Sequence, residues 1–277
     1  MNANSPKSED GAAEPVGIII ILTIFTVSAS IIYVAGVPVL QAQQYETHFR
    51  SIEQGFTSLD SKLSKASLGG SPVQSVSITM GGGSLSVKNS SWMNVTMEDD
   101  SGALTDWINL SLGALVYEHG DRTVGYEAGG VWVSYPGGGS AMISPPEFHY
   151  DGVTLTLPTI RLNGSLSTGG TGTARVVVSS SEPEIKFPKG GKRINPLNVS
   201  SIHVTIRSEY CDAWRRYMEE RTSVEVESNN CEVNKTVKIK LVTPRNVIPF
   251  YQGIFASNYL YLWNNFDAKS YNSAQKK

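Results

Sequence analysis

The residues best suited to acid–base, metal or nucleophilic chemistry are few and scattered along this chain of 277 residues. The four histidines are His48, His119, His149 and His203, and none lies at helix or loop spacing from another histidine or a cysteine. A zinc site normally needs a tighter cluster of ligands. We therefore expect no metal, no cofactor and no catalytic residue.

Three other patterns contain residue types that could serve in catalysis, cation binding or phosphate binding. Glu147 and His149 share a face if they lie on a strand, and we interpret them as a structural hydrogen bond rather than an acid–base pair. The acidic run Glu98–Asp100 is typical of a solvated turn. Gly191–Arg193 lacks the context of a phosphate loop, and there is no Gly-x-Ser-x-Gly elbow. An extracellular enzyme stays an alternative only if distant His, Asp or Glu residues converge on a pocket.

The chain has two cysteines, Cys211 and Cys231. Outside the cell such a pair can form a disulfide, and closing a loop of about 20 residues adds roughly 3 kcal/mol in the chain-entropy description. Two free buried thiols are the alternative. We predict the bond for a body that lies outside the cell.

Six Asn-x-Ser/Thr sequons follow the N-terminal region, and we interpret them as surface N-glycosylation sites. They begin at Asn89, Asn94, Asn109, Asn163, Asn198 and Asn234.

An uncharged apolar stretch runs from Pro15 to Tyr45, between Glu14 and Glu46. A membrane-spanning helix needs roughly 20 mostly apolar residues, so this stretch is long enough. A signal peptide would have a shorter apolar region and a better cleavage site, and a buried core helix is the second alternative. We predict a membrane anchor. Representative anchor residues are Ile18, Ile21, Phe25 and Ile32.

The segment Asp10–Ile18 places a Gly, two small residues and Pro-Val before the apolar helix. It resembles the class III signal of archaeal type IV pilins, although the usual basic residue before the cut is replaced by Glu9-Asp10. The resemblance implies a prepilin-type leader peptidase as partner and cleavage between Gly11 and Ala12.

Glu14 allows two interpretations. In a filament its carboxylate could pair with the new α-amino group of a neighbouring subunit. Alternatively it is an interfacial residue that favours the helix start just before Pro15.

A heptad stripe follows Pro38 and is typical of an amphipathic helix that ends at Gly69-Gly70. The stripe comprises Ala42, Tyr45, Phe49, Ile52, Phe56, Leu59 and Leu63. It could pair with another chain as a coiled coil or lie on the body of its own chain. Three heptads are few for an independent coiled coil, so we favour packing within the chain.

From residue 71 onward short alternating runs separated by Gly, Ser and Pro clusters predict a sandwich-like β domain. Val76–Met80 and Leu85–Val87 are predicted to form a hairpin across Gly81–Gly83. Further strands are predicted at Met93–Met97, Ile108–Glu118, Thr123–Tyr126, Val131–Tyr135, Val153–Leu157, Arg175–Ser179, Ile202–Arg207, Ser223–Glu227 and Val237–Val242. Helices are predicted at Cys211–Arg221 and Pro249–Phe266.

Several segments of the body also carry a family resemblance. They are Gly120–Trp132, Ser144–Tyr150, Tyr210, Trp214, Arg216-Tyr217 and Glu220–Thr222. With the N-terminal segment they resemble a family of archaeal pilin-like membrane proteins of unknown function. The resemblance implies a cell-surface protein and no particular reaction.

The prediction is an α+β protein with a leader-like peptide (1–11), a transmembrane helix (12–40), an amphipathic helix (41–70) and a mainly antiparallel β-rich body (71–277). Charge near the span gives little orientation, because Lys7 is offset by Glu9 and Asp10. The sequons, cysteines and leader-like motif favour a cytoplasmic N-terminus and an extracellular body.

We expect a single-pass structural or adhesion protein, a filament or pseudopilin subunit whose partners are membrane lipid and pilin-like subunits or further copies of itself. A non-polymerising, envelope-anchored binding module is the alternative. With 23 Lys and Arg against 25 Asp and Glu, and no basic aromatic patch, we expect no nucleic-acid partner.

Overall fold

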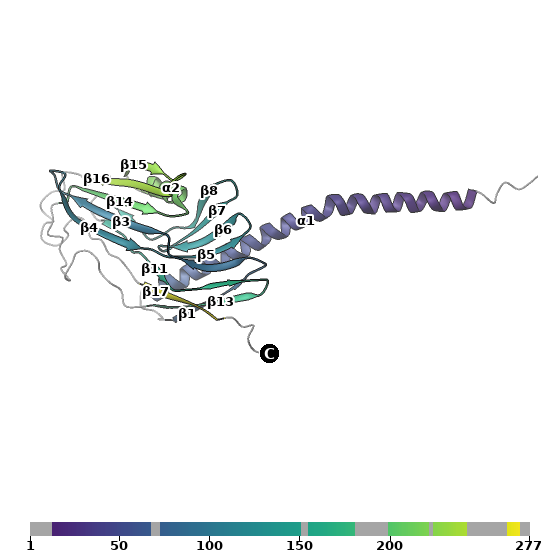
Figure 1. Ribbon diagram of the computed structural model, residues 1–277, viewed down its shortest axis with the longest axis horizontal. Coiled ribbons are helices and arrows are strands. Elements are labelled where there is room, and N and C mark those ends of the chain that lie inside the picture. Colours follow the sequence, from purple (N-terminus) through teal and green to yellow (C-terminus); the bar gives the residue numbers. More distant parts are fainter. Residues whose placement is uncertain are drawn as a thin grey trace, which may run out of the picture. The chain divides into compact units, whose positions relative to one another are not determined.

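The computed structural model describes residues 13–67, 73–150, 155–180, 199–221, 224–242 and 265–271. A long N-terminal helix is followed by three mainly antiparallel sheets, a small two-stranded sheet and one short helix (Figure 1). This confirms the predicted α+β class. By its internal contacts the chain divides into two compact units, Met1–Ser51 and Ile52–Lys277.

Helix α1 runs without interruption from Ala13 to Ser67. Pro38 lies inside it, where proline removes one backbone hydrogen bond. The apolar residues before Pro38 and the heptad stripe after it are therefore parts of one helix, as predicted.

In the second unit, Ile52–Lys277, the apolar stripe of α1 is buried. The buried positions are Ile52, Phe56, Leu59 and Leu63. Polar contacts flank them, since Arg122 pairs with Glu53 at 2.9 Å and Lys62 Nζ donates to the Ser75 carbonyl at 2.8 Å. This part of the stripe thus packs within its own chain, which supports that interpretation over a coiled coil.

Three sheets build the rest of the body. The four-stranded sheet has the order β1 (Val73–Thr79), β13 (Thr173–Ser180), β17 (Asn265–Tyr271) and β11 (Arg161–Asn163). The six-stranded sheet has the order β12 (Ser167–Gly169), β2 (Ser84–Lys88), β5 (Ala114–His119), β6 (Arg122–Glu127), β7 (Gly130–Tyr135) and β8 (Gly139–Ser144). The five-stranded sheet has the order β15 (Val224–Asn230), β16 (Thr236–Val242), β14 (Ser201–Arg207), β3 (Trp92–Glu98) and β4 (Leu104–Ser111). Strands β9 (His149–Tyr150) and β10 (Leu155–Thr156) pair separately.

Helix α2, Cys211–Arg221, covers the apolar face of the five-stranded sheet beside β14, β15 and β16 (Figure 1). Alternate residues of β3, β14 and β16 point into this core, because successive side chains of a strand face opposite sides. The core from this sheet includes Met93, Val95, Met97, Val204, Ile206, Val237 and Ile239. Trp214, Tyr217 and Met218 of α2 close it from the other side.

The predicted hairpin across Gly81–Gly83 is wrong. β1 pairs with β13 and β2 pairs with β12 and β5, so the two strands belong to different sheets. Gly81–Gly83 lead the chain from β1 to β2 and so from one sheet to another. The neighbouring segment Gly170–Gly172 does the same between β12 and β13, and Met80 N donates to Gly172 O at 2.8 Å. An added Cβ at Gly83 would lie 2.4 Å from the Tyr117 ring, so this corner requires glycine.

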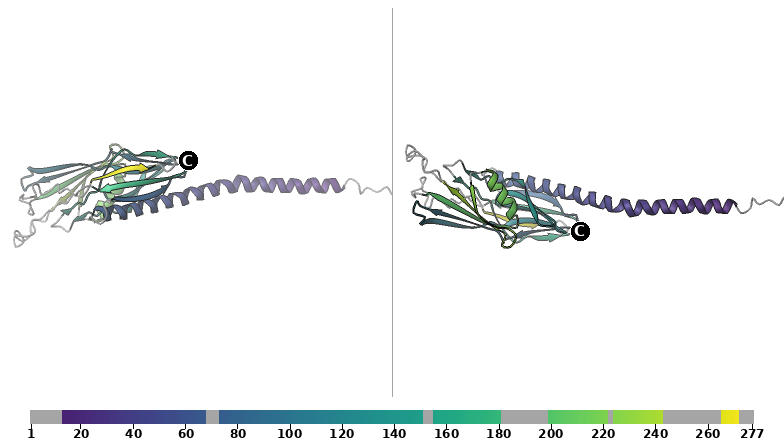
Figure 2. Two further views of the ribbon diagram at one scale, coloured as in Figure 1. Left: turned by 90° about the horizontal axis from the view of Figure 1, so that it is seen from below. Right: turned by 90° about the horizontal axis from the view of Figure 1, so that it is seen from above.

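Three other strand and helix predictions differ from the structure. Ile108–Glu118 is two strands, β4 and β5, separated at Gly113, whose φ is +67°. The predicted helix Pro249–Phe266 falls outside the described residues up to 264, and Phe266 lies in strand β17, which runs beside β13 (Figure 2). Within the predicted strand Val153–Leu157, Leu155–Thr156 is a strand and Leu157 is not, whereas Val153 and Thr154 lie outside the described residues.

Candidate functional site

The first candidate site is the apolar part of α1. By length and composition it is apolar enough to cross a membrane, and its most apolar residues are not buried. The predicted anchor residues Ile18, Ile21, Phe25 and Ile32 are all exposed, Phe25 by 72%. An exposed helix that is apolar all round is typical of a segment that lies in an apolar solvent.

The hydroxyl groups of this segment bond within the helix. Thr23 Oγ1 donates to Ile19 O at 2.7 Å, and Ser30 Oγ donates to Thr26 O at 2.7 Å. Thr26 likewise donates to Leu22 O at 3.0 Å. In lipid, polar groups must find their partners inside the helix, and these hydroxyls do.

The structure does not describe the side chains predicted for processing and assembly. Gly11 and Ala12 lie outside the described residues, and α1 begins at Ala13. Glu14 lies in the first turn of α1, but its side chain is outside the description.

The segments that carry the family resemblance converge in space. Trp132 from β7 and Trp214 from α2 stack with ring centroids 4.3 Å apart, and Phe148 lies 5.6 Å from Trp214. Tyr217 Oη donates to the Pro146 carbonyl at 2.6 Å, and Arg216 donates to the Ser140 carbonyl. Residues from several of the segments that carry the resemblance therefore meet in one packed cluster, which joins α2 to the six-stranded sheet.

Glu127 is the buried acid of this cluster. Its Oε1 accepts from Trp214 Nε1 at 2.9 Å, and its backbone carbonyl accepts from Trp132 Nε1 at 3.1 Å. Burial raises the pKa of the Glu127 carboxyl, against hydrogen bonds from Ser208 and Trp214 that lower it. Glu127 thus binds one indole through its carboxyl and the other through its backbone carbonyl, which fixes the orientation of both rings and is a structural role.

A pocket of about 120 Å³ opens beside Glu127 and Tyr210. Its wall includes Glu118 and Lys88, which pair at 2.5 Å. That volume holds a few water molecules and is below the size of ordinary metabolite sites. The pocket therefore gives no basis for a substrate.

His203 is the centre of a second polar network. Its Nδ1 lies 2.9 Å from Glu227 Oε2 and its Nε2 lies 3.1 Å from Glu98 Oε2. Lys238 Nζ adds a contact of 2.8 Å to Glu227. Although burial raises the pKa of Glu227, hydrogen bonds from Lys238 and His203 hold it below its usual value.

Ser201, His203 and Glu227 have the connectivity of an acyl-transfer triad, since Ser201 Oγ lies 3.4 Å from His203 Nε2. Glu98 Oε2, however, contacts both this nitrogen and the serine oxygen, the latter at 3.4 Å. A carboxylate in that position competes with the proton transfer from serine to histidine. The arrangement favours a cross-strand ion network that ties β3, β14, β15 and β16 together.

Sequence reasoning missed the cluster around Glu127 and the network of His203, because side chains that contact each other lie far apart in the chain; Ser201 and Glu98 are 103 positions apart. The alternation of Ser201 and His203 on one strand was the available signal. Of the other histidines, His48 lies on α1 and His119 ends β5. The side chain of His149 is outside the description, and Glu147 is exposed. No group of three or more His, Cys, Asp or Glu side chains in the described ranges could hold a metal ion.

The interpretation of the acidic run Glu98–Asp100 as a solvated turn holds in part: Glu98 ends β3 and contacts His203, whereas Asp99 and Asp100 lie in the turn that follows. Asp99 Oδ1 accepts from Ser101 Oγ at 2.6 Å and from the Ala103 amide at 3.0 Å. The Ser101 hydrogen bond, followed by the backbone bonds, lowers the pKa of Asp99.

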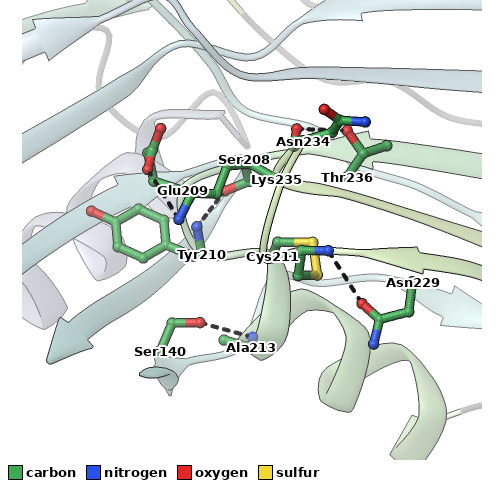
Figure 3. Close-up of a disulfide and its surroundings, with 11 residues drawn as sticks. Ser140, Ser208, Glu209, Tyr210, Cys211, Ala213, Asn229, Asn234, Lys235 and Thr236 are labelled. Carbon is green, nitrogen blue, oxygen red and sulfur yellow. Dashed lines mark hydrogen bonds and ion pairs between the residues drawn. A yellow bond between two sulfur atoms is a disulfide. The ribbon is translucent and has the colours of Figure 1, made fainter. Parts of the chain in front are cut away.

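The two cysteines form the predicted disulfide. It joins the first residue of α2, Cys211, to Cys231 after β15, with Cα atoms 5.4 Å apart (Figure 3). Nearby, the Ala213 amide donates to Ser140 Oγ at 3.0 Å, so the start of α2 is also held to β8.

Five of the six predicted glycosylation sites fall in the described residues. Asn89, Asn109, Asn163 and Asn234 are exposed, whereas Asn94 is half-buried. Asn198 lies outside the described residues.

Comparison with curated proteins and with solved structures finds no match to this chain. The profile of one protein family matches residues 11–249, which is most of the chain. The match takes in the apolar helix, both cysteines and the aromatic cluster around Glu127. The chain belongs to a family of unknown function, DUF7289.

Proposed function

We propose that this protein is an archaeal, pilin-like surface protein, anchored by the apolar part of α1, with a structural or adhesive role and no catalysis. Its N-terminus lies in the cytoplasm and its β-rich body outside the cell. Its partners are membrane lipid and pilin-like subunits, including further copies of itself.

The observation that carries the proposal is the division of α1 between two surroundings. Its first part exposes apolar side chains on every face, and its last part buries one apolar face in the body. One unbroken helix that serves as anchor and then as core element is the arrangement implied by the pilin-like resemblance. An anchor tethered by a flexible linker would not need this continuity.

Two features of the body support its extracellular position. The Cys211–Cys231 bond belongs to an oxidising compartment, and four sequons have exposed asparagines. Both features are on the C-terminal side of the apolar helix, so they agree on one orientation.

The orientation is tested by treating intact cells with a broad-specificity protease. Loss of the body with retention of a membrane fragment containing α1 supports the proposal. A body that is protected until the membrane is permeabilised contradicts it.

The processing step follows from the same proposal, with Gly11 and Ala12 as the cleavage site of a prepilin-type leader peptidase. The N-terminal residue of the protein from native membranes tests it. A chain that begins at Ala12 supports cleavage and assembly, whereas a retained leader favours a static anchor.

Assembly is tested at Glu14. Glu14→Gln keeps the shape of the side chain and removes its charge, so loss of filaments with a folded body supports pairing with a neighbour's α-amino group. Glu46→Gln, on the same helix beyond the apolar stretch, is the matched control. Unchanged assembly in Glu14→Gln favours the interfacial interpretation of this residue.

The second candidate function is a non-polymerising binding module held at the envelope. The observation in its favour is that the apolar stripe of α1 is buried within its own chain, so it is not available to form a coiled coil with another chain. The buried residues are Ile52, Phe56, Leu59 and Leu63. A monomeric protein in detergent with an intact leader distinguishes this candidate from the first.

A further inference from the structure

Trp107 is a large and mostly exposed apolar side chain. It lies on β4, an edge strand of the five-stranded sheet, and is 57% exposed. Its strand neighbour Ile108 points to the other face and is buried in the core. Single exposed apolar side chains are common on protein surfaces, so the position of Trp107 gains meaning only from its neighbours on the same face of the strand.

The same face of β4 carries a sequon two residues further on. Asn109 and Ser111 alternate with the buried Ile108 and Leu110, and both are exposed beside Trp107. Residues two apart on a strand are separated by about 6.6 Å, which is close to the reach of a sugar linked to an asparagine side chain.

The opposite strand adds a second aromatic ring. Asn94 of β3 lies directly across from Asn109, and Trp92 lies across from Ser111. Diagonal neighbours in an antiparallel pair are about 7–8 Å apart, within reach of a tryptophan ring. Asn109 therefore lies between Trp107 on its own strand and Trp92 on the next.

Asn94 is the competing sequon on this face, but its surroundings differ. It lies on β3, which is hydrogen-bonded on both sides, to β14 and β4. Its Oδ1 is buried and has no hydrogen-bond partner among the described residues. Two glycans on directly opposed asparagines would also collide, so the pair accommodates one.

We infer that Asn109, and not Asn94, carries an N-linked glycan whose first sugar ring lies on the face of Trp107. This inference rests on the proposed extracellular position of the body. The C–H face of a pyranose ring covers the apolar ring, and the sugar hydroxyls remain in water. The glycan also screens an edge strand that would otherwise offer unpaired backbone groups to another chain.

The attachment step uses a lipid-phosphate-linked saccharide as donor. The Asn109 amide nitrogen bonds to the anomeric carbon, and the bond from that carbon to the phosphate oxygen breaks. The lipid phosphate leaves with the bonding electrons, and the amide proton passes to a base of the transferase.

The first measurement is site occupancy by mass spectrometry of glycopeptides from the full chain in native membranes. The result expected is a glycan at Asn109 and none at Asn94. Asn109→Gln then removes one glycan from the intact mass, whereas the matched control Asn94→Gln leaves the mass of attached sugar unchanged.

A double-mutant cycle tests the stacking on Trp107. In the glycosylated protein, Trp107→Ala is expected to lower Tm, and in the Asn109→Gln background this loss should shrink. A contact of the size found for aromatic pairs corresponds to a coupling of about 2–4 °C in a domain of this size. Trp107→Phe keeps an aromatic face and should retain most of the coupling.

Each outcome decides a separate point. An empty Asn109 beside occupied Asn89, Asn163 or Asn234 overturns the inference and leaves the extracellular position intact. Occupied Asn109 with additive effects of Trp107→Ala overturns the stacking. An absence of glycan at every sequon overturns the inference as well, and the protease experiment on intact cells then decides the orientation independently.

Discussion

Helix α1 contains two regions that follow the same helical geometry but arrange their apolar residues differently. From Val16 to Leu40 apolar side chains occupy every face and are exposed, whereas from Ile52 onward they occupy one face and are buried. Charged residues are absent from the first region and fill the outer faces of the second. The difference shows that the surroundings of a helix, and not its backbone, decide which of its faces must be apolar.

The largest expected effect comes from placing charge in the first region. Phe25→Asp with Ile32→Asp puts two carboxylates toward the middle of the apolar stretch, at a cost of about 5–7 kcal/mol for insertion into a bilayer. We expect most of the chain to leave the membrane fraction after an alkaline carbonate wash.

The control for this variant is Gln44→Asp with Thr47→Asp, which adds the same charge to exposed positions of the same helix. It should remain in the membrane fraction. Equal retention of both variants would mean that the apolar part of α1 is not the anchor.

The second prediction compares one residue type in the two regions. Phe56 is fully buried and Phe25 is 72% exposed. Phe56→Ala should lower the free energy of unfolding of the body by about 3–5 kcal/mol, because it removes a large core side chain and leaves a cavity. Phe25→Ala should leave the unfolding of the body unchanged.

Denaturant unfolding in detergent, followed by tryptophan fluorescence, measures both variants. A similar loss for the two would show that the exposed part of α1 is also a core element of the folded chain.

The third prediction separates the stability of the body from membrane retention. Cys211→Ser with Cys231→Ser opens a loop of about 20 residues and should cost about 3 kcal/mol. The unfolding midpoint of the body should fall, and the fraction of the chain in the membrane pellet should stay the same. Release of the folded variant from the membrane would contradict an anchor that acts through α1 alone.

The two regions of α1 could be predicted from the sequence because each depends on local spacing. The uninterrupted apolar run and the heptad stripe reflect the helical period itself, and α2 and most strands follow from equally local patterns. The disulfide followed from cysteine count and compartment.

The pairing of the strands could not be predicted in the same way. Gly81–Gly83 signals a turn in the chain, but only the distant segment around Gly170–Gly172 determines that β1 and β2 enter different sheets. The same holds for the cluster of Glu127 with Trp214 and for the network of His203 with Glu98 and Glu227. Each depends on contacts between strands that are far apart in sequence, for which local periodicity carries no information.

The smallest predicted effect concerns pH and the buried region of α1. Asp60 lies there, and its Oδ2 accepts a hydrogen bond from Ser144 Oγ at 2.6 Å. Burial raises the pKa of Asp60 to about 6; the Ser144 hydrogen bond opposes this shift, and the charge of Glu147 adds to it. The buried hydroxyl of Tyr126 also faces this charge, since Asp60 contributes to raising the pKa of Tyr126 after burial.

A pKa raised above the unfolded value means that the folded state favours the protonated acid. The contribution of Asp60 to stability is therefore complete below about pH 4 and is lost as pH rises through about 6. With allowance for partial solvent exposure, Asp60→Asn should stabilise the body by about 1–2 kcal/mol at pH 8 and have little effect at pH 4. Unfolding curves at the two pH values measure the difference, with the exposed Glu46→Gln as control on the same helix. An equal effect of Asp60→Asn at both pH values would show that packing, and not the charge, limits stability here. A pH-dependent effect would assign a charge penalty to Asp60 in the buried region of α1, a penalty that has no counterpart in the apolar stretch because that stretch carries no carboxyl group.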